Sequence, residues 1–472
     1  MDKYEQFRLV IEKGKEGFRK FDKSKVVRLV SHLDSDGITA CAVIIRLLNQ
    51  ENMRYSVSIV QQLTKTVLFE LSREEYEQYI FTDLGSGQLN NIKQFLGNRK
   101  VLVLDHHMPE NAELGDNIIQ VNPHLAGIEG DREISGSGVA YLFAKSVNEK
   151  NKELAHIALI GAIGDVQENN GFLQLNNEIL EDAKAAGKIE VKQGLRLFGA
   201  QTKPVHKVLE YCTDPYIPGV TGRESGAVQF LQDLGINPKN SKGWKKVIHL
   251  TDEEMKKLVA GIVMRRLGEE NPEDVLGNIY LLTGEEKDSP TRDAREYSTL
   301  LNACGRLGKA SYGIGACLGD CKIKKAAVQS LQNYKREIID AINWYENNKK
   351  NQEKVVKEEG YLIINAQDEI LSTIIGTLAS IIAKSDVKDG TLILSMAQLI
   401  DNTTKCSLRI AGKLKPGLNL KKIIGEIVAE VGGEAGGHAH AAGAVIQTEK
   451  EEEFIKSAKL ILKKYSMEEV IV

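Results

Sequence analysis

Short apolar runs alternate with amphipathic stretches through the first third of the chain, and this alternation constrains the fold most. The apolar runs predict strands at Val26–Val30, Tyr55–Val60, Tyr79–Thr82 and Val101–Leu104. The stretches between them have helical spacing at Gly37–Asn49, Lys65–Leu71 and Gln88–Phe95. Runs of four to six apolar residues separated by helices are typical of a parallel sheet covered on both faces. Functional groups in such sheets gather where strands end and helices begin.

The predicted secondary structure changes twice along the rest of the chain. Two helices are predicted at Gly136–Asn148 and Lys152–Gly164, and the region after about residue 167 is mainly helical, with helices near Pro204–Tyr211, Ser225–Leu234, Thr251–Leu267 and Lys322–Lys350. A second α/β unit begins at Gly360. Its predicted strands are Tyr361–Asn365, Thr391–Met396, Lys405–Ala411 and Gly443–Gln447, and its helices are Leu371–Lys384, Leu420–Val431 and Glu452–Lys464. We therefore predict an α/β protein with a parallel-sheet domain at 1–170, a mainly helical middle region at 171–350 and a smaller α/β domain at 351–472.

Composition excludes several classes of protein. Hydrophobic residues make up 42% and charged residues 27% of the 472 residues, as in an ordinary globular protein, and the net charge is −3. Contact with nucleic acid would therefore need a local basic patch. No run of about 18 apolar residues predicts a membrane span. The first residues do not resemble a signal peptide. The six cysteines show no spacing typical of a disulfide framework, which is consistent with reduced thiols, so we expect a cytoplasmic location.

The first group of residues with chemical potential is His32, Asp34 and Asp36, directly after the first predicted strand. If the segment stays extended, alternating residues point to the same side. One imidazole and two carboxylates can then hold one or two divalent cations, and Gly37 allows a sharp turn. The alternative is structural: Asp36-Gly37 is a turn and Asp34 caps the next helix.

Three further acidic residues also end apolar elements. Asp83 closes YIFTD, Asp105 closes VLVLD and is followed by His106 and His107, and Asp165 closes IGAIGD. Each one alone is consistent with a turn or a cap. Together they predict a cluster, because carboxylates this close repel each other unless cations neutralise them. Mixed oxygen and imidazole ligands favour Mn²⁺ or Mg²⁺ over structural zinc.

These segments resemble a known family. HLDSDG, FTDLGSG, LDHHMP and IGAIGD, in this order, resemble the four motifs of the DHH phosphoesterase superfamily, and NPHLAG and EISGSG are similar to the RecJ branch. Near the C-terminus, GGHAHAAG resembles the GGHxxAAG signature of the DHH-associated domain, and CSLRIAG resembles the strand before it. NACGRLGKASYGIGACLGD looks like archaeal RecJ-like proteins, including the GINS-associated nuclease, a branch related to eukaryotic Cdc45-type replication factors.

The resemblance implies a Mn²⁺- or Mg²⁺-dependent single-strand exonuclease with two cations in each active site. It implies that His32 and Asp34 bind one cation and that Asp36, His106 and Asp165 bind the other. Asp83 is implied to bridge the two cations. Asp105 becomes a ligand or a residue that orients an imidazole. His107 is expected to contact the scissile phosphate or to protonate the leaving oxygen.

The C-terminal motif implies substrate contacts. Gly436 and Gly437 let the backbone approach a phosphate closely, Arg409 supplies a forked donor, and His438 can contact a phosphate or a base. The alternative interpretation of the same residues is a tight glycine-rich turn with a buried histidine. The expected partners are single-stranded DNA or RNA and GINS or other components of the replicative helicase, with no membrane.

Two other functions remain open at this point. A small-substrate phosphatase of the superfamily would act on oligoribonucleotides, cyclic dinucleotide products, 3′-phosphoadenosine phosphate or pyrophosphate. Such members usually lack an insert like residues 170–350. A replication scaffold of the Cdc45 type would bind GINS with little activity. Relatives of that type lose metal-site carboxylates, and none is missing from this sequence.

Overall fold

The computed structural model describes residues 1–168, 171–212, 215–241, 243–269, 271–384, 387–412, 417–437 and 439–467. These residues form two compact units, Met1–Leu331 and Gln332–Val472. None of the helices in these described ranges is both long enough and apolar enough to cross a bilayer.

A five-stranded parallel sheet organises the first unit. Its strands are β1 (Val27–His32), β2 (Tyr55–Val60), β3 (Gln78–Thr82), β4 (Lys100–Leu104) and β5 (Ile118–Val121). They lie side by side in the order β2-β1-β3-β4-β5, and every neighbouring pair is parallel. The order reverses at β1, so the carboxyl ends of β1, β3 and β4 meet at a topological switch point, where α/β proteins bind ligands.

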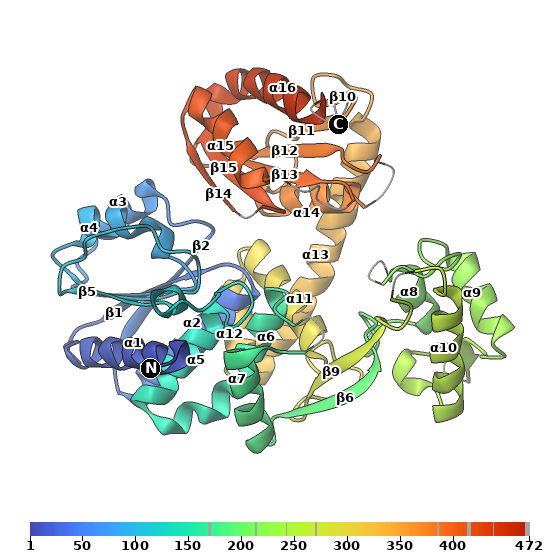
Figure 1. The fold of residues 1–472 in the computed structure, drawn as a ribbon, viewed down its shortest axis with the longest axis horizontal. Helices are drawn as coiled ribbons and strands as arrows, with labels where there is room; N and C mark the ends of the chain where they lie inside the picture. Colours follow the sequence, from blue (N-terminus) through green and yellow to red (C-terminus); the bar gives the residue numbers. More distant parts are fainter. Residues whose placement is uncertain are drawn as a thin grey trace. The chain divides into compact units, whose positions relative to one another are not determined.

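Helices cover both faces of this sheet (Figure 1). One face carries α1 (Lys3–Arg19), α2 (Ser35–Gln50), α5 (Gly136–Val147) and α6 (Ala155–Gly164). The other face carries α3 (Lys65–Arg73) and α4 (Leu89–Leu96), whose leucines and isoleucines share a buried cluster with β1, β3 and β4. The inner strands are buried over almost their whole length, which explains their continuous apolar sequences.

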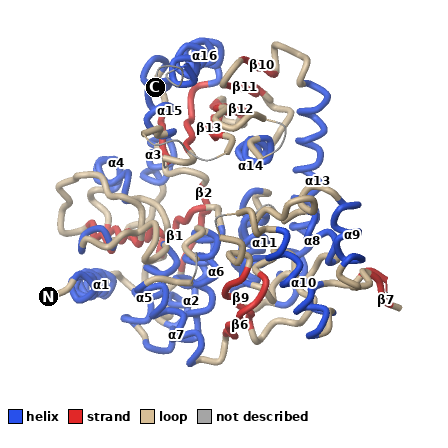
Figure 2. The backbone as a smooth tube through the Cα atoms, turned by 45° about the vertical axis from the view of Figure 1, so that its right-hand side comes forward, coloured by secondary structure: helices blue, strands red, loops and turns tan. Residues whose placement is uncertain are grey.

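A long two-stranded ribbon leads out of the first unit's helical layer. After α7 (Gln174–Ala185), strand β6 (Ile189–Leu195) pairs antiparallel with β9 (Leu276–Leu282) (Figure 2). The chain between them forms a small lobe with its own apolar core. The elements of this lobe are α8 (Val205–Glu210), α9 (Glu224–Asp233), β7 (Lys239–Asn240), β8 (Gly243–Trp244) and α10 (Asp252–Arg265). After β9, α11 (Ala294–Arg306) and α12 (Ala310–Cys317) pack against α2.

The second unit is built on a six-stranded mixed sheet. It follows α13 (Cys321–Asn348), which crosses the division at Leu331. The strands are β10 (Val355–Glu358), β11 (Tyr361–Asn365), β12 (Leu392–Gln398), β13 (Thr403–Ile410), β14 (Glu434–Gly437) and β15 (Ala442–Gln447). Their order is β10-β11-β12-β13-β15-β14. The helices are α14 (Ser372–Ile382), α15 (Leu420–Val431) and α16 (Glu451–Met467), and α15 and α16 pack together.

The structure confirms the predicted fold class, an α/β protein with an N-terminal parallel sheet and a second mixed sheet. Several local features differ from the prediction, among them the following three. The edge strand β5 was not predicted, because its IIQV sequence is too short to show a period. The β6–β9 ribbon joins segments about eighty residues apart, so no local pattern marks it. The predicted helix Lys152–Gly164 is divided into a 3₁₀ segment, Glu149–Leu154, and α6.

A buried carboxylate fixes α1 to the loop that precedes α5. Glu133 accepts hydrogen bonds from Lys3 Nζ at 2.7 Å and from Tyr4 Oη at 2.6 Å. Burial raises the pKa of Glu133, but these two donors outweigh it and hold the pKa below the usual value. The ion pair therefore stabilises the fold fully above about pH 4.5, and this contribution disappears as the pH falls through the lowered pKa.

We expect Glu133→Gln to reduce the free energy of unfolding by about 1–3 kcal/mol at pH 7, as for other hydrogen bonds to charged groups. Urea titrations at a series of pH values would measure this difference, which should vanish in acid. Glu12→Gln is the control, because Glu12 pairs with Lys15 on the surface and should change stability by less than about 1 kcal/mol. A difference between Glu133→Gln and wild type that persists unchanged below the lowered pKa would contradict this explanation.

Candidate metal centre

The turn from β1 into α2 brings three of the predicted residues together. The strand ends at His32, Asp34 is the N-cap of α2 and accepts from Gly37 N at 3.0 Å, and Asp36 lies in the first helical turn. The expectation that residues 32–36 continue as a strand is therefore wrong. Asp34 is a helix cap and also faces His32, with 2.8 Å between its Oδ2 and Nδ1.

Two backbone features hold this turn. Gly37 is required because an added Cβ would lie 2.4 Å from the His32 carbonyl oxygen. Asp36 reaches the first turn of α5, where its carboxylate accepts from Gly136 N at 2.6 Å and Ser137 N at 3.0 Å. A helix N-terminus favours a carboxylate, because its first N–H groups have no partner within the helix. Asp36 is fully buried.

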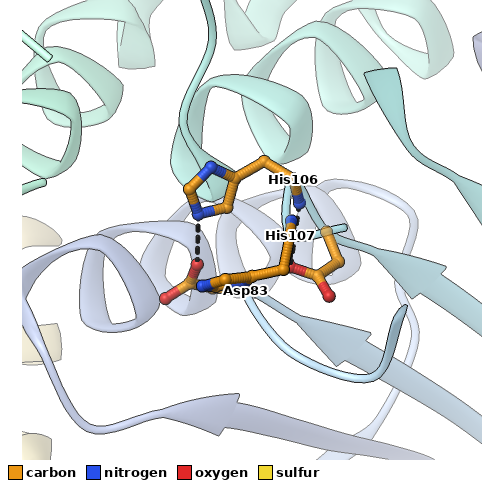
Figure 3. Close-up of side chains that lie close together, drawn as sticks. Asp83, His106 and His107 are labelled. Carbon is orange, nitrogen blue, oxygen red and sulfur yellow. Dashed lines mark hydrogen bonds and ion pairs between the residues drawn. The ribbon is translucent and has the colours of Figure 1, made fainter. Parts of the chain in front are cut away.

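Asp83 follows β3 and sits at the centre of the cluster. Its backbone has φ +59°, an uncommon left-handed conformation that Asp and Asn tolerate better than most residues. Oδ2 lies 3.5 Å from His32 Nδ1, and Oδ1 lies 3.3 Å from His106 Nε2. The carboxylate thus faces a different imidazole with each oxygen. Figure 3 shows the His106 ring directed at Asp83.

The two histidines that follow β4 are oriented differently. His106 Nδ1 contacts the Gly130 carbonyl oxygen at 2.9 Å, which requires a proton on Nδ1 and directs the other ring nitrogen, Nε2, toward Asp83. His107 Nδ1 instead lies 2.7 Å from Asp105 Oδ1. Asp105 also accepts from Ser86 N at 2.9 Å, so this buried carboxylate is fully engaged in holding the loop and the His107 ring.

Asp165 completes the cluster from α6, where it is the C-cap residue. Its Oδ2 lies 3.3 Å from His106 Nε2. Among the residues that the structure describes, three groups have potential ligand atoms within 4.8 Å of one another. Two of these groups share Asp83, and two share His106. The groups are His32, Asp34 and Asp83; Asp36, His106 and Asp165; and Asp83, Asp105, His106 and His107.

The electrostatics of this cluster are those of a site with excess negative charge. Burial raises the pKa of Asp36 and repulsion from Asp83 raises it further, to about 7. Burial lowers the pKa of His32 and of His106, but the surrounding carboxylates outweigh it and raise both well above the usual value. The pocket therefore attracts positive charge, either as protons or as cations.

The donor set fits a divalent cation. Within the described residues, both carboxylate oxygens of Asp83 and Nε2 of His106 are buried without a hydrogen bond of good geometry. Leaving such atoms unsatisfied in the interior costs free energy, which a coordinated cation would recover. Aspartate oxygens with a minority of imidazoles are ligands that suit Mn²⁺ and Mg²⁺.

Several supporting residues carried no signal in the sequence. Gln167 Nε2 donates to the same Gly130 carbonyl oxygen at 2.8 Å, and Asn176 Nδ2 donates to Gln167 Oε1 at 2.7 Å. Asn302 of α11 accepts from Ser35 N at 2.9 Å and so fixes the start of α2. Asn302 lies 267 residues from Ser35, and no local pattern could have linked them.

The predicted C-terminal residues lie in the second unit. Arg409 on β13 donates to Ser380 Oγ at 3.2 Å, to its neighbour Leu408 O at 2.8 Å and to Ala442 O at 3.2 Å. Gly436 and Gly437 end β14, which pairs with β15. A Cβ added at Gly436 would meet open space, whereas Gly437 has φ +118°. His438 lies outside the described residues.

Fold and site together define an α/β protein with an Asp- and His-rich ligand cluster at the carboxyl edge of a parallel sheet. Family models match three segments of the chain: the DHH family N-terminal domain at residues 26–162, the DHH-CID domain at 197–279 and the DHHA1 domain at 359–464. The chain is also 32% identical over 442 residues to the uncharacterized protein MJ0831 of Methanocaldococcus jannaschii, covering 92% of this chain and 93% of that protein. The chain belongs to the DHH family.

Further similarities connect the chain to proteins with named activities. A putative single-strand DNA-specific exonuclease, YorK of Bacillus subtilis, is 27% identical over 150 residues, which cover 29% of this chain and 25% of that protein. RecJ of Thermus thermophilus in complex with Mn²⁺ has a TM-score of 0.58 at 16% identity, covering 96% of this chain, and the chain spans 55% of the length of that RecJ. CDC45 of Entamoeba histolytica has a TM-score of 0.61 at 13% identity, with 98% of both chains covered. At these identities the two solved structures establish the fold alone.

Proposed function

We propose that this protein is a Mn²⁺- or Mg²⁺-dependent exonuclease that hydrolyses single-stranded DNA or RNA, or both, and releases nucleoside monophosphates during replication or repair. The observation that carries this proposal is the convergence of Asp83 and His106, whose buried, unsatisfied atoms face each other from adjacent strands. RecJ of Thermus thermophilus, solved in complex with Mn²⁺, supports the metal, and YorK, a putative single-strand DNA-specific exonuclease, supports the substrate.

The residues divide into two ligand sets that share one carboxylate. His32 and Asp34 would hold one cation, and Asp36, His106 and Asp165 the other. Asp83 would bridge them, which agrees with its two oxygens facing His32 and His106 separately. Cations held by these residues would activate a water and would offset the negative charge on the scissile phosphate.

His107 and Asp105 provide the proton chemistry in this proposal. Burial lowers the pKa of His107, but Asp105 outweighs it and raises the pKa to about 9. Asp105 thus favours the protonated form of this imidazole, which could donate a proton to the leaving oxygen. Asp105 holds the ring through Nδ1 at 2.7 Å and keeps the positive charge on it.

The C-terminal residues are proposed to bind substrate. Arg409 would pair with a phosphate, and the open space beside Gly436 permits close approach of a phosphate to the backbone. His438 is assigned the same role from the sequence motif. We further propose the division of the chain into domains at 1–170, 171–350 and 351–472, and each of the three family models falls within one of these ranges.

A test of this function uses end-labelled single strands of different length. With Mn²⁺, we expect stepwise shortening of a 20-mer of DNA or RNA to mononucleotides, and no cleavage in EDTA. Labels at the 5′ and 3′ ends would also give the polarity. Turnover confined to two- to five-mers would replace this proposal with the small-substrate phosphatase.

A scaffold role is the second candidate. The likeness to CDC45 over 98% of both chains favours it, and binding of GINS or other helicase components belongs to this candidate. A chain that binds such partners but leaves labelled single strands intact at saturating Mn²⁺ would establish the scaffold in place of the exonuclease.

A further inference from the structure

Large aromatic side chains are exposed on the small lobe between β6 and β9, and three of them have a lysine over the ring. The exposed fractions are 43% for Phe198, 57% for Tyr211 and 43% for Trp244. Rings of this size are normally buried or engaged in an interface, because exposing them forfeits hydrophobic stabilisation.

Lysines cover these rings. Lys203 Nζ lies 5.0 Å from the Phe198 ring centroid and 5.3 Å from that of Tyr211. Lys239 Nζ lies 4.4 Å from the ring of Trp244, on the other strand of the β7–β8 hairpin. We call these five residues, Phe198, Lys203, Tyr211, Lys239 and Trp244, the aromatic–lysine surface.

Contacts around α8 connect the part of this surface on the β7–β8 hairpin, which carries Trp244, to the part that carries Tyr211. His206, which is buried, lies with its ring centroid 4.0 Å from that of Trp244 and supports the indole from inside the lobe. Val205 N donates to Lys245 O at 2.7 Å, so the hairpin is fixed to the start of α8. Tyr211 is the residue that caps the other end of the same short helix. The positions of Trp244 and Tyr211 are therefore both fixed relative to α8.

The charge of the segment is opposite to that of the chain. Residues 196–250 contain eight Lys and Arg but four Asp and Glu, whereas the whole protein has a net charge of −3. Much of this charge is already paired. Lys207 contacts Glu210 and Glu224, Lys245 contacts Glu254, and Lys246 contacts Asp288. Over the whole lobe, residues 196–275, twelve Lys and Arg are nearly balanced by eleven Asp and Glu. The positive charge that bears on nucleic-acid contact is therefore that of Lys203 and Lys239, which lie at the exposed rings.

We propose that the aromatic–lysine surface binds single-stranded nucleic acid, with bases stacked on Trp244 and Tyr211 and phosphates paired with Lys203 and Lys239. Exposed aromatic rings interleaved with cations are the recognised elements of sequence-independent single-strand binding. A duplex keeps its base faces stacked inside the helix, so it cannot use these rings. This surface is separate from the metal cluster and adds a second contact to the proposed active site.

Intrinsic fluorescence provides a direct test. The chain has two tryptophans, so Trp344→Phe leaves Trp244 as the single indole. In EDTA, titration of this variant with a 20-mer of dT should quench the Trp244 emission, since a stacked base shields the indole. A duplex of equal length should quench it far less. Equal quenching by both would overturn the proposal.

Affinity measurements by fluorescence anisotropy complete the test. Trp244→Ala should weaken binding of the labelled 20-mer at least about fivefold, the lower end of what one stacked base contributes. Lys203→Ala combined with Lys239→Ala should reduce the slope of log K against log[salt] by about 0.7 for each phosphate that the lysines no longer neutralise. Phe69→Ala is the matched control, because Phe69 is 50% exposed beneath Arg73 and lies outside this surface.

Failure of this proposal can be told apart from failure of the proposed function. Binding is measured without divalent cations, so it needs no hydrolysis. In a separate assay, Trp244→Ala should leave Mn²⁺-dependent hydrolysis of bis(p-nitrophenyl) phosphate unchanged, because that compound is too small to need a second contact. The proposal would be overturned if Trp244→Ala and the double lysine variant both bound the 20-mer with the affinity of wild type. That result would favour a protein partner for this surface.

Discussion

Asp83→Asn is expected to lower the rate of Mn²⁺-dependent cleavage of single strands by at least about 10³-fold, which corresponds to about 4 kcal/mol less transition-state stabilisation. Asp83 would be the carboxylate that both cations share, since its two oxygens face His32 and His106. Asparagine is chosen because the position has φ +59°, where Asn is tolerated and Ala is strained. The slower cleavage would therefore report on the removed charge and not on a damaged backbone.

The same variant should behave in the opposite way in a stability measurement. Without metal, removing one of several neighbouring carboxylates relieves repulsion, so the melting temperature should stay the same or rise. With Mn²⁺ at about 100 times its dissociation constant, a bound site adds about 2.7 kcal/mol to wild type. The variant should lose most of this Mn²⁺-induced shift.

Calorimetry or thermal scanning with and without Mn²⁺ measures this effect beside the cleavage assay. Asp22→Asn is the matched control, because Asp22 is an exposed loop residue that bonds to Ser24. Full activity in Asp83→Asn, or a Mn²⁺-induced shift equal to that of wild type, would be incompatible with the assigned metal centre.

Gly136→Ala is expected to reduce cleavage about 10²-fold by displacing ligands without removing any. A Cβ at this position would lie 2.5 Å from Asp83 Oδ1 and 3.0 Å from Asp36 Oδ2. The Asp36 carboxylate cannot move away easily, because it accepts hydrogen bonds from two N–H groups of the α5 N-terminus. A displacement of about 1 Å in a catalytic constellation typically costs this much in rate, and the added methyl should destabilise the fold by about 1–3 kcal/mol.

A second glycine in a motif serves as the control for this substitution. Gly87 lies in FTDLGSG beside Asp83, yet a Cβ added there meets nothing within 4 Å. Gly87→Ala should therefore leave the rate and the Mn²⁺ requirement nearly unchanged. Titrating Mn²⁺ separates the two effects, since displaced ligands should also raise the Mn²⁺ concentration needed for half-maximal rate in Gly136→Ala. Equal rates for the two variants would show that Gly136 does not limit the ligand geometry.

Much of the candidate site could be predicted from local sequence because parallel strands place their carboxyl ends at one edge. Asp83 and Asp105 each follow a buried strand, and the ladder between those strands brings both residues to the same edge. The sequence left two interpretations of Asp34 open, a helix cap or a residue of the cluster. In the structure Asp34 is both, because it caps α2 and contacts His32. The strand geometry predicted for residues 32–36 was wrong, because the helix begins at Ser35.

The supporting contacts and the lobe surface could not be predicted in this way. Gln167, Asn176 and Asn302 resemble ordinary polar residues in the sequence, and they act only through partners that the fold brings to them. Tyr211 and Trp244 lie 33 positions apart, on a helix end and a hairpin strand, and only the fixing of that hairpin to α8 places both on one surface.

The sequence by itself determined the α/β class, the parallel sheet and the residues at the strand ends, because side-chain periodicity and strand-end chemistry are local properties. The tertiary structure decided which atoms face each other. Asp83 directs one carboxylate oxygen to His32 and the other to His106, and the N-terminus of α5 binds the Asp36 carboxylate. The physical reason is that hydrogen-bond and ion-pair distances depend on how distant segments pack, and packing is a property of the whole chain.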